Sequence, residues 1–366
     1  MNKVISFIKT ETVLVISIVL AVISSFFGDT TDLLSFIDFK TLALLFCLMA
    51  VMAGFKECNI FSYAAEKLLK RTSTTRLVVL VLVLLCFFFS CLITNDVALI
   101  TFVPFSITVL KFANKSSLIP ITVILQTVAA NMGSALTPIG NPQNIYIFSV
   151  SNLSLLDFIR LMIPYSVVTL IFLLCSVLFI KGEPINKKPN EISTPKLERT
   201  VFYFILFVLS ILAVFGAVNY ILCLLLVAIS VLIFDKKIIL KVDYSLLLTF
   251  VGFFIFVGNM GTLPAVKELI EELLFGREIL FSALISQVIS NVPAALMLSG
   301  FTDNMSALLV GVNIGGLGTL IASMASLISY KYVAAELPAK KGKYLLVFTL
   351  INFALLGVML FLSLII

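Results

Sequence analysis

The sequence predicts an all-α polytopic membrane protein made of two inverted repeats, each with a re-entrant helical hairpin and a broken transmembrane helix. Three observations lead to this fold class. First, 61% of the 366 residues are hydrophobic and 12% are charged, whereas soluble domains have about 45–50% and about 25%. Second, the loops between apolar runs differ systematically in charge. Third, interrupted apolar segments recur in the same order in both halves.

Uninterrupted apolar runs predict the ordinary membrane spans. A span needs about 20 apolar residues. Such runs fall near 12–27, 38–55, 158–180, 200–215, 217–234, 243–260 and 344–366. The first run is followed by "GDTTD" and not by a small-residue cleavage site, so we interpret it as a retained span.

The charged loops predict the side on which each span ends. Basic loops are 56–76, 111–115, 181–199, 235–241 and 331–343, and acidic ones are 28–38 and 264–278. Because basic loops stay in the cytoplasm, the N-terminus is expected there, in a cytoplasmic (inner) membrane. Segment 76–113 must then enter and leave from the cytoplasm, and segment 278–301 from outside. Both are predicted hairpins, with tips at Thr94-Asn95-Asp96 and Ser290-Asn291.

The two halves also share sequence features. Asn131 and Asn313, Gly133 and Gly315, and Thr137 and Thr319 stand at one constant offset. The predicted domains are repeat 1–180 (hairpin 76–113, broken helix 117–150), cytoplasmic linker 181–199, connecting span 200–216 and repeat 217–366 (hairpin 278–301, broken helix 305–330). Inverted repeats with discontinuous helices are typical of secondary transporters, which hold substrate between the halves.

The interrupted helices carry the chemistry that we expect. A helix broken in the membrane exposes N–H groups at one new end and C=O groups at the other. Helix N-termini attract anions, and carbonyl or side-chain oxygens suit Na⁺. The amides of Asn95, Asn141, Asn144 and Asn291 offer donors and acceptors, while Gly133 and Gly315 permit the unwound geometry. Isolated Ser, Thr or Gly residues in a span are also explained by helix packing or local bonding.

Asp96 is the carboxyl group that the sequence places deepest in an apolar segment. A charge at that depth costs about 3 kcal/mol or more, and such residues mark ion pathways or proton relays. The alternative interpretation is that Asp96 lies at the interface or caps the half-helix that follows it.

Several classes of protein are excluded or disfavoured. The chain has no histidine, which excludes histidine metal sites and Ser-His-Asp hydrolase chemistry. One deep aspartate does not make the pair that an intramembrane protease needs, so we do not expect an enzyme. A channel stays open as an alternative, because turnover rate distinguishes it from a transporter and the sequence does not. The six cysteines lack the spacing of a disulfide framework or metal site, and no cofactor is expected beyond possible Na⁺.

Four motifs together resemble the ion transporter superfamily, which contains arsenite permeases, divalent anion/sodium symporters, citrate transporters and sodium/proton antiporters. They are "ITNDVALITFVPF" at 93, "TPIGNPQN" at 137, "SNVPAALML" at 290 and "GVNIGGLGTLIASMASLIS" at 311. The resemblance covers nearly the whole chain and is closest to the arsenite-permease-like anion transporters. It implies a homodimer with a scaffold part and a mobile transport part that moves like an elevator.

The resemblance, together with the residue chemistry above, assigns roles to particular residues. Substrate-binding positions are Thr94, Asn95, Thr137, Asn141, Asn144, Ser290, Asn291, Thr319 and Ser323. Cation-coupling positions are Asn95, Asp96, Gly133, Asn291 and Gly315. Two departures from the dicarboxylate symporters are Val292, where a hydroxyl is expected at the second tip, and Asp96, where the symporters carry a hydroxyl at the first.

These features predict a secondary active transporter for a small anion, oxyanion or metalloid acid, coupled to H⁺ or Na⁺. The alternatives are a Na⁺/H⁺ antiporter and a sodium-coupled di- or tricarboxylate symporter. The expected partners are a small inorganic or organic anion, the lipid bilayer and a second copy of the chain, with no role for nucleic acid.

Overall fold

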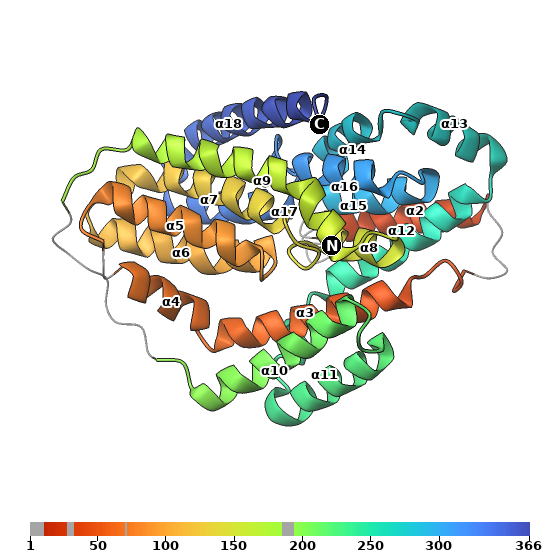
Figure 1. Ribbon diagram of the computed structural model, residues 1–366, viewed down its shortest axis with the longest axis horizontal. Helices are drawn as coiled ribbons and strands as arrows, with labels where there is room; N and C mark the ends of the chain where they lie inside the picture. The colour runs from red at the N-terminus through yellow and green to blue at the C-terminus, as the bar shows by residue number, and fades with distance from the viewer. Residues whose placement is uncertain (1–10, 28–32, 70–71, 185–193) are drawn as a thin grey trace, which may run out of the picture.

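The computed structural model of the protein describes residues 11–27, 33–69, 72–184 and 194–366 (Figure 1). These residues form helices joined by turns and contain no β-strand. Seven of their helices are long and apolar enough to cross a membrane. The predicted all-helical polytopic class is therefore confirmed.

The first half of the chain contains eight α-helices among the described residues. They are α2 (Thr12–Ser25), α3 (Phe39–Glu57), α4 (Ile60–Leu69), α5 (Thr75–Ser90), α6 (Asn95–Phe112), α7 (Ile119–Ser134), α8 (Pro142–Val150) and α9 (Leu155–Leu178). The short 3₁₀ helix η1 (Ser116–Leu118) leads into α7.

The second half continues with nine described α-helices. They are α10 (Leu197–Val214), α11 (Tyr220–Asp235), α12 (Tyr244–Gly261), α13 (Pro264–Leu274), α14 (Glu278–Ile289), α15 (Asn291–Leu298), α16 (Met305–Ile314), α17 (Met324–Glu336) and α18 (Lys341–Leu362). Three 3₁₀ helices, η2 (Ile239–Lys241), η3 (Ser299–Phe301) and η4 (Pro338–Lys340), lie between them.

The interruptions fall where the polar motifs predict them. The first hairpin divides between α5 and α6, and the second between α14 and α15 at Ser290. The broken helices divide at 135–141 and 315–323. Two expected spans are shorter than predicted, since α2 has 14 residues and α11 has 16. Residues 1–10 and most of the linker, 185–193, lie outside the described residues, so the predicted side of the N-terminus stays a prediction.

Local signals explain where several helices begin. Asp38 caps α3, its carboxylate accepting the Thr41 N–H at 3.1 Å, and Asp243 caps α12 by accepting the Leu246 N–H at 2.9 Å. Proline begins α8 and α13, where its missing N–H removes no helical bond.

The helices form two packed groups. In Figure 1, α5–α9 and α14–α18 fill the upper part, with α3, α10 and α11 below. We call the first group the hairpin body, and we call α2, α3 and α10–α12 the frame. The two meet where α3 packs against α8 and α12 packs against α15. The most buried candidate span is the segment of α7, which lies in the hairpin body with 72% of its residues inside the protein.

Helix partners correspond between the two halves. The pair α5–α7 matches α14–α16, α6–α17 matches α15–α8, and α2–α12 matches α11–α3. Helix α10 has no counterpart in this scheme and packs on α3 and α11, as a connecting span would. The correspondence is consistent with two related halves, and the inverted repeat itself stays a prediction.

Candidate functional site

Each hairpin tip is tied to the helix break of its own half by a backbone hydrogen bond. The Asn95 N–H donates to the carbonyl of Gly140 at 3.1 Å, and the Asn291 N–H donates to the carbonyl of Ala322 at 3.0 Å. Gly140 and Ala322 stand at the same offset as the other repeated residues. The tips and breaks are therefore positioned together in both halves.

Two of the three predicted site threonines make a second matched pair of bonds. The hydroxyl of Thr137 donates to the carbonyl of Cys91 at 2.5 Å, and that of Thr319 donates to the carbonyl of Gln287 at 2.9 Å. Cys91 and Gln287 each stand four residues before the tip asparagine. Both threonine side chains thus join the end of a hairpin's first helix to a break, and their substrate-binding role stays a prediction.

Gly133 and Gly315 allow the hairpins to approach the broken helices. A Cβ atom on Gly133 would lie 2.2 Å from the carbonyl oxygen of Phe87, and one on Gly315 would lie 2.8 Å from the Cα of Ala283. Both contacts are too short for any side chain, so glycine is required there by packing. The predicted part of these glycines in cation coupling is not tested by this geometry.

Asn131 joins the two halves at the centre of the hairpin body. Its Oδ1 accepts the Asn95 side-chain amide at 3.2 Å and the Ser323 hydroxyl at 3.0 Å. Its Nδ2 donates to the carbonyl of Gly316 at 3.3 Å. Three of these four residues are buried polar side chains that come from both halves.

Asn313, the counterpart of Asn131, makes the reverse connection. Its Nδ2 donates to Oδ1 of Asn144 at 2.7 Å. Its own Oδ1 is buried and has no hydrogen-bond partner among the described residues. Asn291 lies close by, since a Cβ on Gly316 would be 3.0 Å from the Asn291 Nδ2 and 3.2 Å from the backbone oxygen of Asn313.

We call this group the central polar cluster: Asn95, Asn131, Asn144, Asn291, Asn313 and Ser323, all of them buried. Four of these six belong to the predicted site. Asn131 and Asn313 were not among the predicted site residues, although their constant offset had marked them as repeated positions.

The remaining predicted residues shape the backbone around the cluster. Asn141 donates to the hydroxyl of Ser134 at 2.7 Å, within the first break. Ser290 has a positive φ of 80°, which costs a residue with a side chain about 1–3 kcal/mol. Thr94 is the N-cap residue of α6, but its side chain makes no capping hydrogen bond. The structure therefore places Ser290 at a strained tip and Thr94 beside the cluster.

Asp96 lies in the first turn of α6, directly after the tip. Thr94 occupies the N-cap position, so the alternative interpretation of Asp96 as the helix cap is wrong. Its Oδ1 is buried without a hydrogen-bond partner among the described residues.

This arrangement offers two kinds of ligand group. Helices α6, α8, α15 and α17 all begin at the tips and breaks, so their N–H ends favour an anion. Oδ1 of Asn313, Oδ1 of Asp96 and both side-chain atoms of Gln143 are buried and unpaired within the described structure. Each unpaired buried polar group costs about 1–3 kcal/mol, and a polar ligand would recover part of that cost.

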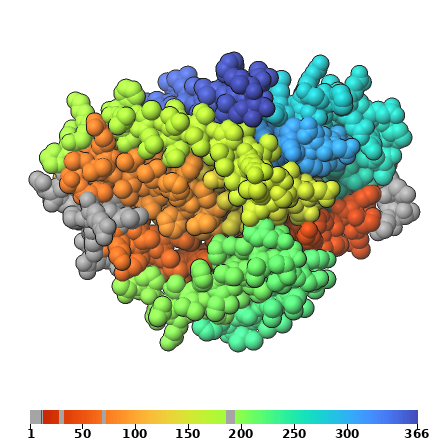
Figure 2. Space-filling model, in the orientation of Figure 1, coloured from red at the N-terminus to blue at the C-terminus, as the bar shows by residue number. Residues whose placement is uncertain are grey.

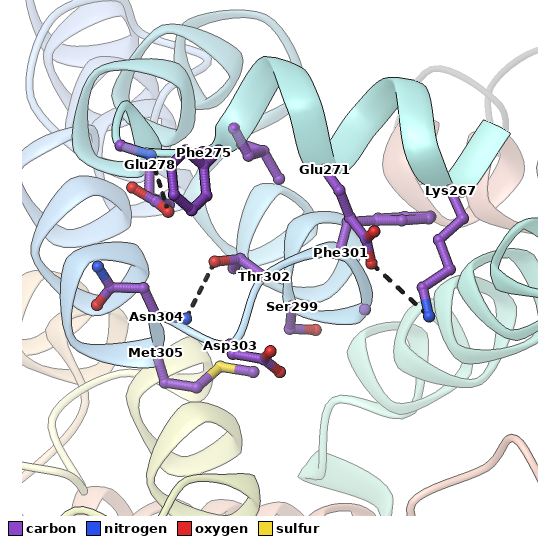
Figure 3. Close-up of a pocket in the computed structure, with 13 residues that line it drawn as sticks. Lys267, Glu271, Phe275, Glu278, Ser299, Phe301, Thr302, Asp303, Asn304 and Met305 are labelled. Carbon is purple, nitrogen blue, oxygen red and sulfur yellow. Dashed lines mark hydrogen bonds and ion pairs between the residues drawn. The ribbon is translucent and has the colours of Figure 1, made fainter. Parts of the chain in front are cut away.

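A separate pocket of about 630 Å³ lies at the base of the second hairpin, between α13, η3 and the start of α16 (Figure 3). Its lining includes Glu271, Glu278 and Asp303, and Lys267 pairs with Glu271 at 3.7 Å. None of the predicted site residues lines this pocket. The tips and breaks, and not this outer pocket, are the candidate site.

Comparisons with known proteins show similarity to membrane transporters. The citrate transporter family model matches residues 3–309. An uncharacterized transporter of Methanocaldococcus jannaschii is 34% identical over 85% of both chains. An inner membrane protein of Escherichia coli is 32% identical over 81% of this chain and 80% of its own. The silicon efflux transporter of rice is 32% identical over 39% of this chain and 30% of its own.

The family model covers most of the chain, and the two longer matches extend over the frame and the hairpin body alike. The expected membership of the ion transporter superfamily is confirmed, as is the expectation of a transporter and not an enzyme. This chain belongs to the citrate transporter family.

Proposed function

We propose that this protein is a secondary active transporter of a small anion, oxyanion or metalloid acid, coupled to H⁺ or Na⁺. The observation that carries the proposal is the central polar cluster, where four helix N-termini and buried amides from both halves meet. Such a site recognises charge and hydrogen-bonding shape and provides no group for bond-breaking chemistry.

The residues of the cluster favour a small polar solute over a large dicarboxylate. The cluster contains no lysine or arginine, so an anion would be held by amides, hydroxyls and helix ends. Val292 supplies no hydroxyl at the second tip. The rice relative is named as a silicon exporter, and a small oxyacid of that kind suits a site made of neutral donors and acceptors.

Asp96 is the residue that we assign to coupling. Its carboxylate has a buried oxygen without a partner among the residues that the structure describes, and a bound cation or proton would remove the cost of that charge. A Na⁺/H⁺ antiporter is one alternative. The dicarboxylate symporter remains the other alternative.

The first experiment is the melting temperature of the purified protein in Na⁺ and in K⁺, with arsenite, silicate, other oxyanions and dicarboxylates. A ligand that binds the folded protein raises the melting temperature by mass action. We expect an oxyanion or metalloid acid to do so. Stabilisation by Na⁺ alone would favour the antiporter, and stabilisation by a dicarboxylate only in Na⁺ would favour the symporter.

The Asp96→Asn variant tests the coupling assignment. Asparagine keeps the shape of the side chain and cannot titrate, so transport into liposomes should lose its dependence on the driving ion. Asp303→Asn, a change of the same kind in the outer pocket, serves as the matched control and should keep that dependence. Ion dependence that persists in Asp96→Asn would exclude Asp96 as the coupling residue.

A further inference from the structure

A basic pocket lies at one end of the frame, far along the chain from the hairpin tips. It has a volume of about 540 Å³ and lies between the end of α3, the start of α10, the end of α11 and η2. Figure 2 shows α10 and α11 as a lobe along the lower edge of the molecule. The lining side chains are Glu57, Arg199, Leu232, Ile233, Phe234, Asp235, Lys236, Lys237, Ile238 and Lys241.

Two of the basic residues in the pocket are already neutralised. Arg199 pairs with Asp235, which also accepts the Tyr203 hydroxyl at 3.3 Å, and Lys241 pairs with Glu57 at 2.5 Å. Lys236 and Lys237 are exposed and make no ion pair within the described part of the chain. The pocket therefore keeps two uncompensated positive charges.

The helices that line the pocket are packed tightly against one another. Tyr203 packs so closely on α3 that a Cβ on Gly54 would lie 2.0 Å from its ring. Phe202 and Phe234 stack with their ring centroids 4.2 Å apart, which joins α10 to α11. The two ion pairs thus rest on a tightly packed base and not on isolated surface side chains.

The pocket lies beside an apolar surface that faces outward. Ile233 and Leu240 are 80% and 83% exposed, and Leu232 and Phe234 are also exposed. In a membrane protein, such a surface at the end of a helix contacts lipid chains. Uncompensated lysines directly next to it stand at the level of the lipid headgroups.

We propose that this pocket binds the phosphate headgroup of an anionic phospholipid, with the acyl chains lying along the exposed face of α11. Lys236 and Lys237 contact the phosphate, while Arg199 and Lys241 hold the acidic residues away from it. Basic pockets between membrane helices recognise such headgroups. A bound lipid would bridge α3, α10 and α11 and stabilise the frame.

The test uses the full chain in neutral detergent, titrated with phosphatidylglycerol. We expect the lipid to raise the melting temperature and to remain bound in native mass spectra. Lys236→Gln/Lys237→Gln should weaken the apparent affinity about 30-fold, at about 1 kcal/mol per lysine and about 1.4 kcal/mol per tenfold. Lys331→Gln/Lys341→Gln, which removes two exposed lysines elsewhere, should bind as the parent protein does.

Four outcomes would overturn the proposal. Equal stabilisation by phosphatidylcholine would mean that the charge of the headgroup is not recognised. The same shift with sodium phosphate alone would indicate a site for a soluble anion. The proposal is also wrong if Lys236→Gln/Lys237→Gln binds the lipid with unchanged affinity. It is equally wrong if this double variant changes the oligomeric state of the protein and not its lipid binding.

Discussion

Replacing each of the two central asparagines by alanine should destabilise the protein to different extents. In Asn131→Ala, the Asn95 amide and the Ser323 hydroxyl lose the one acceptor that the described structure gives them. Two orphaned buried donors at about 1–3 kcal/mol each cost about 2–6 kcal/mol. In Asn313→Ala, Oδ1 of Asn144 alone is orphaned, which costs about 1–3 kcal/mol.

Thermal unfolding of the purified variants checks this difference. The difference of one orphaned group, about 1–3 kcal/mol, corresponds to a few degrees in melting temperature. Asn352→Ala is the matched control, because Asn352 is also buried. Among the described residues it donates only to Phe348 of its own helix, and its Oδ1 has no partner. We expect the order of losses to be Asn131, then Asn313, then Asn352. An Asn313 variant as unstable as the Asn131 variant would refute the assignment of the partners.

Two further substitutions test close contacts. Gly133→Ala places a Cβ 2.2 Å from the backbone oxygen of Phe87, so overpacking should lower the free energy of unfolding by about 1–3 kcal/mol and reduce transport. Gly342→Ala is the control, because Gly342 has open space around it, and its stability should not change measurably. Thr41→Val removes a hydroxyl bond of 2.6 Å between α3 and Ser149 of α8. We expect this variant to change the maximum transport rate and not the substrate affinity. Liposome uptake at varied substrate concentration measures both, and an unchanged maximum rate would contradict the prediction.

The fold class and the breaks could be predicted because their causes are local in the chain. Asparagine, proline and glycine inside an apolar run interrupt a helix wherever that run is placed. The tips at Asn95 and Asn291 and the break at 137–144 therefore followed from the residues themselves. The lengths of α2 and α11 did not, because the apolar run continues past the end of α2 at Phe26 and Phe27 and begins before the start of α11, at Ala217 and Val218.

Pairing between the halves could not be predicted in the same way. Asn131 meets Ser323 and Asn144 meets Asn313 across a large separation in sequence, which depends on how α7, α8, α16 and α17 pack. The constant offset marked Asn131 and Asn313 as repeated positions, yet a repeated residue is as often structural as functional.

The bonds between the halves bear on how the proposed transporter moves. Because Asn131 and Asn313 each bond to the opposite half inside the central polar cluster, separating the halves there would break buried hydrogen bonds in every cycle. The links between the hairpin body and the frame are of another kind. Thr41 of α3 contacts Ser149 near the end of α8, away from the cluster. If the hairpin body moves as one unit along α3 and α12, the central polar cluster stays intact. Only bonds between the hairpin body and the frame, such as the one between Thr41 and Ser149, have to break and re-form. We therefore infer that an elevator-type movement costs less than a rocking of one half against the other.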